Sequence, residues 1–153
     1  MADSINNIVG GRYYILELIG RGGSAIVYKA RDIHNGGIYA LKKYITSDPA
    51  NRKRLLEGME RELEVLKNCT HPVLPKIFDL IKIEDAFFLV MEYIDGIDLK
   101  KYVDEYGTLS TKMLVKVMEQ VCSGFYYLHS LSPAIVYRDL KPSNIILCKD
   151  GRI

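Results

Sequence analysis

Short runs of hydrophobic residues, bounded by glycines and polar residues, dominate the first part of the chain, and this pattern is typical of β-strands. Three such runs lie between Tyr13 and Ile45, and Gly-Gly pairs that favour turns precede the second and the third. Two more runs, LPKIFDLIKI and AFFLVMEY, are joined by the polar pair Glu84 and Asp85. The pattern therefore predicts five consecutive strands.

Two longer segments have the apolar spacing of helices instead. Asp48 and Pro49 resemble an N-cap and a first-turn proline, and they precede a predicted helix with the apolar residues Leu55, Met59, Leu63 and Leu66. A second predicted helix runs from Ser110 to Ser130, with the apolar stripe Leu114, Val117, Met118, Val121, Phe125 and Leu128. The last segment has strand-like ends around a proline-containing loop, and its Lys-Asp-Gly sequence predicts a hairpin turn. Together these elements predict an α+β chain with a seam near residues 93–96.

Composition and charge exclude several classes of protein. The chain has 153 residues, of which 48% are hydrophobic and 26% are charged, as expected of a globular domain. A formal net charge of +2 gives no reason to expect a nucleic-acid partner. The apolar run AFFLVM is too short to span a membrane, and the first ten residues lack the features of a secretory signal. The three cysteines have no metal-binding spacing and indicate free thiols, so we expect a cytoplasmic protein with no membrane segment in this chain.

The sequence IGRGGSAIVYKA places three glycines, Gly20, Gly22 and Gly23, between two predicted strands. Glycine lets the backbone approach a ligand closely and expose its N–H groups to phosphate oxygens. A dinucleotide-binding fingerprint needs a helix after the glycines, and a Walker loop needs Gly-Lys-Ser/Thr, so neither fits. A strand–loop–strand flap over phosphates remains, although a plain turn explains the glycines equally well when they are taken alone.

The sequence YALKK places two adjacent lysines on opposite faces of a predicted strand. Ala40 and Lys42 share one face, whereas Lys43 lies on the other. Either lysine can simply extend to water, but a lysine on an apolar face needs a counter-charge. The helix that follows offers four candidates, and its periodicity does not choose among them: Glu57, Glu60, Glu62 and Glu64.

The sequence YRDLKPSNIIL contains an acid, a lysine and an amide in the pattern D-x-K-x-x-N, namely Asp139, Lys141 and Asn144. A carboxylate can accept a proton from a hydroxyl group, a lysine can neutralise a phosphate, and an amide oxygen can bind Mg²⁺. A glycine flap and a strand lysine precede this loop in the chain. The combination predicts a phosphoryl-transfer site.

With these motifs in this order, the chain resembles the front part of a bacterial-looking, eukaryotic-type Ser/Thr protein kinase, from about Tyr13 to its end. The resemblance implies a kinase-like N-lobe of five antiparallel strands and one helix in residues 10–94, which binds ATP. An incomplete helical C-lobe would occupy residues 95–153. The resemblance also implies ATP and Mg²⁺ as cofactors and a protein substrate with a Ser or Thr acceptor, because the KPSN sequence is similar to Ser/Thr kinases rather than tyrosine kinases.

The resemblance also implies a role for individual residues. Asp139 would be the catalytic base, Lys141 the γ-phosphate contact and Asn144 a magnesium ligand. Lys42 would hold the α- and β-phosphates, with Glu62 as its partner on the helix. The other implied residues lie in the flap (Ile19, Gly20, Gly22, Gly23), the adenine pocket (Val27, Ala40, Ile146), the gatekeeper position and the hinge (Met91, Glu92, Ile94) and the ribose contact (Asp98).

The sequence departs from the family pattern at three places. Ala25 replaces the third glycine of the flap, and Tyr137 replaces a histidine, which we interpret as a change in packing. No Asp-Phe-Gly sequence is present, and in the family its aspartate is the main protein ligand of the magnesium ions. Losing one such stabiliser typically lowers the rate by about 10²–10³, so we expect residues 1–153, as a fragment truncated before this motif, to lack efficient activity by themselves.

Other hypotheses stay open beside the kinase. A short, non-catalytic, pseudokinase-like module could bind a nucleotide or a protein partner without transferring phosphate. A small-molecule kinase is disfavoured, because that class usually lacks this flap and the DLKPSN sequence. The helix predicted over residues 110–130 is apolar over much of its circumference, which predicts either self-association or burial against segments outside this chain.

Overall fold

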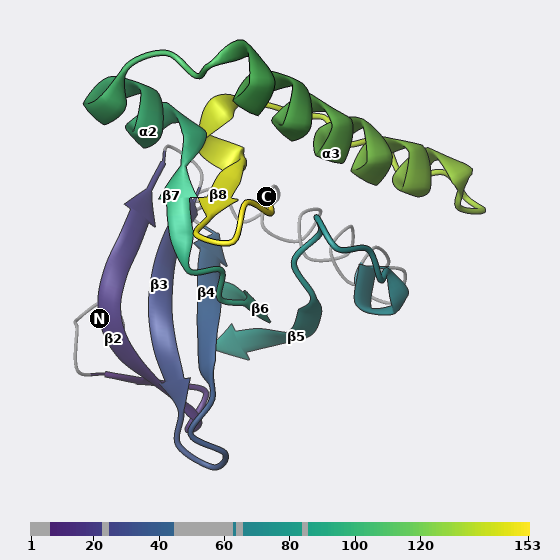
Figure 1. Ribbon diagram of the computed structural model, residues 1–153. Helices are drawn as coiled ribbons and strands as arrows, with labels where there is room; N and C mark the ends of the chain where they lie inside the picture. Colours follow the sequence, from purple (N-terminus) through teal and green to yellow (C-terminus); the bar gives the residue numbers. More distant parts are fainter. Residues whose placement is uncertain (1–6, 23–24, 45–62, 64–65, 84–85) are drawn as a thin grey trace. The chain divides into compact units, whose positions relative to one another are not determined.

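The computed structural model describes residues 7–22, 25–44, 63, 66–83 and 86–153 (Figure 1). The chain divides into two compact units, residues 1–69 with 75–93 and residues 70–74 with 94–153. Each unit has its own cluster of buried hydrophobic side chains. Because the short segment 70–74 belongs to the second unit, the chain passes between the two units three times.

An antiparallel sheet makes up most of the described part of the first unit (Figure 1). The five strands predicted from the sequence are confirmed, and a two-residue strand at the edge of the sheet is added to them. This strand was missed because two residues are too few to produce a pattern. In sheet order the strands are β1 (Ile8–Val9), β2 (Tyr13–Arg21), β3 (Ala25–Asp32), β4 (Ile38–Tyr44), β6 (Ala86–Glu92) and β5 (Ile77–Ile83).

Alternate side chains along the strands belong to a buried core on one face of this sheet. In β3, Ile26, Tyr28 and Ala30 belong to the hydrophobic core, and the residues between them lie on the opposite face. Phe88 and Val90 of β6 complete the core and have no exposed surface. The opposite face of β3, β4 and β6 is therefore left for other contacts.

Asp32 is a buried charge at the end of β3, with no exposed surface. Its Oδ2 accepts hydrogen bonds from Nε and Nη2 of Arg12 at 2.9 and 2.7 Å, and its Oδ1 accepts one from the His34 N–H at 2.9 Å. The hydrogen bonds from the Arg12 guanidinium hold the pKa of Asp32 below its ordinary value. The paired charge thereby ties the turn that follows β3 to the start of β2.

The second unit is built from helices and two very short strands. The predicted helix is confirmed as α3 (Thr111–Ser130), and Ser110 caps it by accepting a hydrogen bond from the Met113 N–H. Among the described residues, no helix is long and apolar enough to cross a membrane. The other elements are β7 (Gly96–Asp98), α2 (Leu99–Tyr106), the 3₁₀ turn η1 (Pro142–Asn144) and β8 (Ile146–Cys148).

Several elements differ from the sequence prediction. The sequence pattern predicted no element between the seam near residues 93–96 and the helix that begins at Ser110, so it missed β7 and α2. The strand β7 carries no pattern of its own because it obtains its hydrogen bonds from β8, which is distant in the sequence. The strand-like start predicted at residues 134–137 is wrong, since the Ile135 N–H donates to the Leu128 carbonyl and the segment turns back onto α3. The turn at residues 149–151 is confirmed, with Gly151 at a φ of 81°. Of the helix predicted after Asp48, residues 63 and 66–68 are helical, and the rest lies outside the described residues.

One side of α3 is buried, and another part of its surface is apolar and exposed. The buried positions are Val117, Val121, Gly124 and Leu128. The exposed apolar residues are Leu114, Val115, Met118 and Tyr126. The helix is therefore apolar on more than one side, as its sequence indicates, and self-association through this surface stays a prediction.

Segment 70–74 packs tightly on α3. The Thr70 N–H donates to the Tyr127 hydroxyl at 3.0 Å, and the His71 ring stacks on the Tyr127 ring with centroids 5.2 Å apart. At Gly124 a Cβ atom would lie 2.6 Å from Cγ2 of Val73. Glycine is therefore needed at this position of the helix, because any larger residue would push the segment away.

We predict that Gly124→Ala lowers the free energy of unfolding of the intact protein. Alanine favours a helix by about 1 kcal/mol over glycine, but overpacking typically costs about 1–3 kcal/mol. Denaturant unfolding of the single variant, of Val73→Ala and of the double variant tests this. In the Val73→Ala background the same change should stabilise, because the obstructing methyl group is gone. A stabilising effect of Gly124→Ala by itself would contradict the close packing.

Candidate functional site

One face of the sheet brings together five of the predicted site residues. Directly opposed residues in an antiparallel ladder point to the same face. Gly20 is paired with Val27, Val27 with Lys42, and Ala40 with Met91. These side chains lie on the face opposite the hydrophobic core, on four neighbouring strands. We call this surface the site face.

The two adjacent lysines of β4 lie on different faces, as the sequence predicts. The Nζ atom of Lys42 is 5.3 Å from the centroid of the Tyr44 ring, on the site face. The Nζ atom of Lys43 is 5.8 Å from the centroid of the Phe88 ring, on the core face. Glu62, the implied partner of Lys42, lies outside the described residues, so their pairing stays a prediction.

Two glycines of the flap, Gly20 and Gly22, are not required by the packing of the described residues. The hairpin between β2 and β3 is closed by a hydrogen bond from the Gly22 N–H to the Ala25 carbonyl at 2.8 Å. A Cβ atom at Gly20 or Gly22 would make only ordinary contacts, at 3.8 and 3.7 Å, and neither residue has a positive φ. This favours the interpretation that the glycines leave room for a ligand. Ile19 is half-buried in β2, and Gly23 lies outside the described residues.

The predicted hinge begins at the end of β6. The Glu92 N–H donates to the Lys76 carbonyl at 2.8 Å, and Oε2 of Glu92 accepts a hydrogen bond from the Lys76 N–H at 3.1 Å. These bonds hold the last residue of β6 beside the start of β5. Ile94 belongs to the second unit, so the predicted hinge residues are divided between the two units.

The acid, lysine and amide of the D-x-K-x-x-N pattern form one hydrogen-bonded cluster in the second unit. The Nζ atom of Lys141 is 2.7 Å from Oδ2 of Asp139, and Nδ2 of Asn144 donates to the same oxygen at 3.0 Å. Asn144 Nδ2 also donates to the Asp139 carbonyl at 2.8 Å. All three side chains are exposed, so a ligand can reach them.

The same cluster offers oxygen atoms that suit Mg²⁺. With the amide nitrogen of Asn144 turned toward Asp139, its amide oxygen is directed away from that carboxylate. Mg²⁺ is commonly bound through one or two protein oxygens together with phosphate oxygens and water. Within the described ranges, no group of three His, Cys, Asp or Glu side chains forms a metal site. The Asn144 amide oxygen is therefore a candidate ligand for a magnesium ion.

Tyr137, at the position where the family has a histidine, is a packing residue. Its ring lies 5.9 Å from the ring of Phe125 in α3, centroid to centroid. Burial raises the pKa of Tyr137, and a hydrogen bond with Asn144 opposes this effect. The phenol therefore stays protonated at neutral pH.

Asp98 and Ile146 face each other in the ladder of β7 and β8. Oδ1 of Asp98 accepts a hydrogen bond from the Lys101 N–H at 2.9 Å, so Asp98 is the N-cap of α2. Oδ2 of Asp98 is 3.3 Å from Nζ of Lys101. The carboxylate implied as the ribose contact thus has a structural role that the sequence analysis did not detect.

Comparison with known proteins identifies what this chain is similar to. Residues 13–153 match the family model of the protein kinase domain. The serine/threonine-protein kinase PrkC of Bacillus subtilis (strain 168) is 37% identical over 149 residues, which are 97% of this chain and 22% of PrkC. The probable serine/threonine-protein kinase PknB of Lactococcus lactis subsp. lactis (strain IL1403) is 30% identical over 149 residues, which are 97% of this chain and 23% of PknB.

A solved structure has the same fold. The crystal structure of Rad53 1–466 in complex with AMP-PNP matches with a TM-score of 0.77 and 31% sequence identity. The match covers 91% of this chain and 35% of the Rad53 chain. The chain therefore spans about a fifth of the length of the two bacterial relatives and about a third of the solved chain.

The capping role of Asp98 can be tested by substitution. We predict that Asp98→Ala lowers the free energy of unfolding by about 1 kcal/mol, because the cap hydrogen bond is lost. Asp98→Asn keeps an acceptor at the cap and should change stability by only a few tenths of a kcal/mol. Denaturant unfolding measures both. Equal losses in the two variants would show that the carboxylate charge, and not the cap, stabilises the unit.

Proposed function

The chain belongs to the protein kinase family, and from this membership we propose that it supplies the ATP-binding unit and the catalytic loop of a serine/threonine-protein kinase. In the intact protein this site transfers a phosphoryl group from ATP to a Ser or Thr hydroxyl of a protein substrate. The observation that carries the proposal is the cluster of Asp139, Lys141 and Asn144, since it joins a base, a phosphate-binding cation and a magnesium ligand.

The site face of the first unit supplies the contacts to the nucleotide. Lys42 neutralises phosphate charge beside the glycine flap, and the apolar side chains around it accept the adenine ring. The similar Rad53 structure is a complex with AMP-PNP, which is an analogue of ATP, and this supports the assignment. The proposed binding residues are Ile19, Gly20, Gly22, Gly23, Val27, Ala40, Lys42, Glu62, Met91, Glu92, Ile94, Asp98 and Ile146.

The loop of the second unit supplies the chemistry. The carboxylate of Asp139 accepts the proton of the acceptor hydroxyl, and Lys141 balances the charge of the transferred group. The amide oxygen of Asn144 would hold Mg²⁺. A bound Mg²⁺ ion would supply positive charge that neutralises the phosphates. The three cysteines are thiols and not disulfides, which supports a cytoplasmic location, where ATP is available.

We predict that Asp139→Asn lowers the kcat of the intact protein by about 10²–10⁴, the range for loss of a general base, while ATP binding is kept. Transfer of labelled phosphate to Ser, Thr and Tyr peptides measures this. Asp150→Asn is the matched control, because Asp150 is an exposed acid paired with Arg152 in the same unit. Unchanged transfer by Asp139→Asn would remove the proposed base. ATP binding without any transfer by the wild type would favour a non-catalytic module.

We also predict that Lys42→Ala weakens ATP binding by about ten- to a hundredfold, as for a lost hydrogen bond to a charged group. Lys43→Ala removes the neighbouring charge from the core face and should leave the Kd for ATP nearly unchanged. Isothermal titration of both variants, with their free energies of unfolding measured alongside, tests the assignment. An equal loss of affinity in both variants would exclude a specific role for Lys42.

A further inference from the structure

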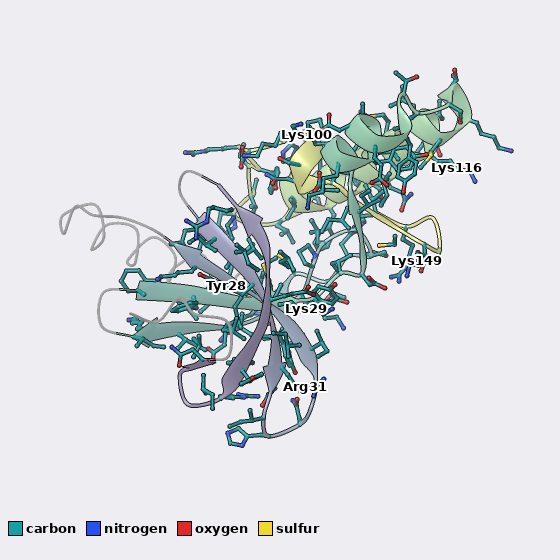
Figure 2. All side chains as sticks on the ribbon, turned by 90° about the vertical axis from the view of Figure 1, so that its left-hand side faces the viewer. Tyr28, Lys29, Arg31, Lys100, Lys116 and Lys149 are labelled. Atoms are coloured by element: carbon teal, nitrogen blue, oxygen red, sulfur yellow. The ribbon has the colours of Figure 1, made fainter. Side chains whose placement is uncertain are left out.

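Lys29 is a cation on the site face that no motif singles out. It is paired with Glu17 on β2 and with Ala40 on β4, and Ala40 is paired with Met91 on β6. Figure 2 shows Lys29 and its neighbour Tyr28 on opposite sides of β3, with Tyr28 on the buried side. The Lys29 side chain is 27% exposed, so much of it is covered, whereas Arg31 two residues later is exposed.

The partly covered side chain of Lys29 joins three segments of the first unit. Its Nζ atom lies 3.2 Å from Oε1 of Glu17 and 4.6 Å from the centroid of the Tyr93 ring. A hydrogen bond with Glu17, and to a smaller extent one with Tyr93, raises the pKa of Lys29, so the ammonium group remains a cation at neutral pH. β2, β3 and the residue that follows β6 are therefore held together by one charge.

The position of this charge relates it to the base end of the proposed nucleotide site. Lys29 is opposite Ala40, which lies two residues before Lys42, the residue proposed to bind phosphate, on β4. Ala40 is proposed to line the adenine pocket, Met91 is proposed as the gatekeeper, and Tyr93 follows two residues after Met91. The Lys29–Tyr93 contact therefore borders the apolar part of the site face and not its phosphate end.

We infer that Lys29 is a positioning residue, which holds Tyr93 and β2 at the border of the adenine pocket and thereby sets the affinity for the base half of the nucleotide. This inference rests on the proposed function. A cation over an aromatic ring and a half-exposed ion pair are each modest interactions, so the effect on binding is modest as well. The effect of Lys29 also differs from that of Lys42, because the phosphates of the nucleotide take no part in it.

Binding of adenosine and of ATP distinguishes the roles of the two lysines of the site face, Lys29 and Lys42. Isothermal titration of the intact protein with each ligand should show that Lys29→Met weakens both by a similar factor, roughly three- to tenfold. Lys42→Ala should weaken ATP strongly and adenosine little. Lys29→Arg should restore binding, because a guanidinium group can pair with Glu17 and stack on Tyr93. Arg31→Met, an exposed cation on the same strand, is the matched control and should bind both ligands as the wild type does.

Tyr93→Leu tests the contact itself. If Lys29 acts through the Tyr93 ring, the effect of Lys29→Met on adenosine affinity is smaller in the Tyr93→Leu background, whereas general destabilisation leaves the two effects additive. If Lys29→Met does not fold, Glu17→Gln replaces it in the same measurements of adenosine affinity, because this variant removes only the ion pair. The inference would be overturned if the folded variants bound adenosine as the wild type does, or if the effects of Lys29→Met and Tyr93→Leu were additive. The proposed function would still stand in that case, provided that the wild type binds ATP. Absence of ATP binding by the wild type would overturn both.

Discussion

The register of β3, β4 and β6 is the constraint on which the first unit depends. Side chains alternate between the two faces of a strand, so a slip of one residue would move every core residue to the other face. Burial of Tyr28, Leu41 and Val90, which are paired across the three strands, opposes such a slip. Because Val27 and Lys42 lie between these positions, burying the core also selects which lysine faces the site. A single alignment thus sets both the core face and the site face.

The second unit depends on a close backbone approach. A Cβ atom at Gly96 would lie 2.5 Å from the carbonyl oxygen of Leu147, so only glycine allows β7 to pair with β8 at this point. This pairing brings the segment after the hinge next to the segment that follows the acid–lysine–amide loop. The Leu99 N–H, at the start of α2, donates to the Ile145 carbonyl at 2.8 Å and continues the same contact. Elements of only three residues are stable here because they hold each other in place.

Long periodic segments could be predicted, and short ones could not. β2 to β6 and α3 carry enough alternating or stripe-forming residues for the sequence to reveal them, whereas β7 holds only three residues and needs a partner from the end of the chain. The loop that contains Asp139, Lys141 and Asn144 could be singled out from its D-x-K-x-x-N pattern, since these residues lie within six positions of one another. The cap formed by Asp98 and the contacts of Lys29 with Glu17 and Tyr93 carry no motif, because their partners come together only when strands and helices pack.

The amino-acid sequence by itself determined the strand that carries Lys42 and the loop that carries Asp139, because these features depend on local periodicity and spacing, and its motifs resemble those of the protein kinase family. The tertiary structure decided what the side chains contact. Only the fold pairs Asp32 with Arg12, turns the Asn144 amide nitrogen toward Asp139 and places the Lys29 ammonium over the Tyr93 ring. The physical reason is that hydrogen bonds and cation–ring contacts act over a few ångströms, and chain folding alone brings distant residues within that range.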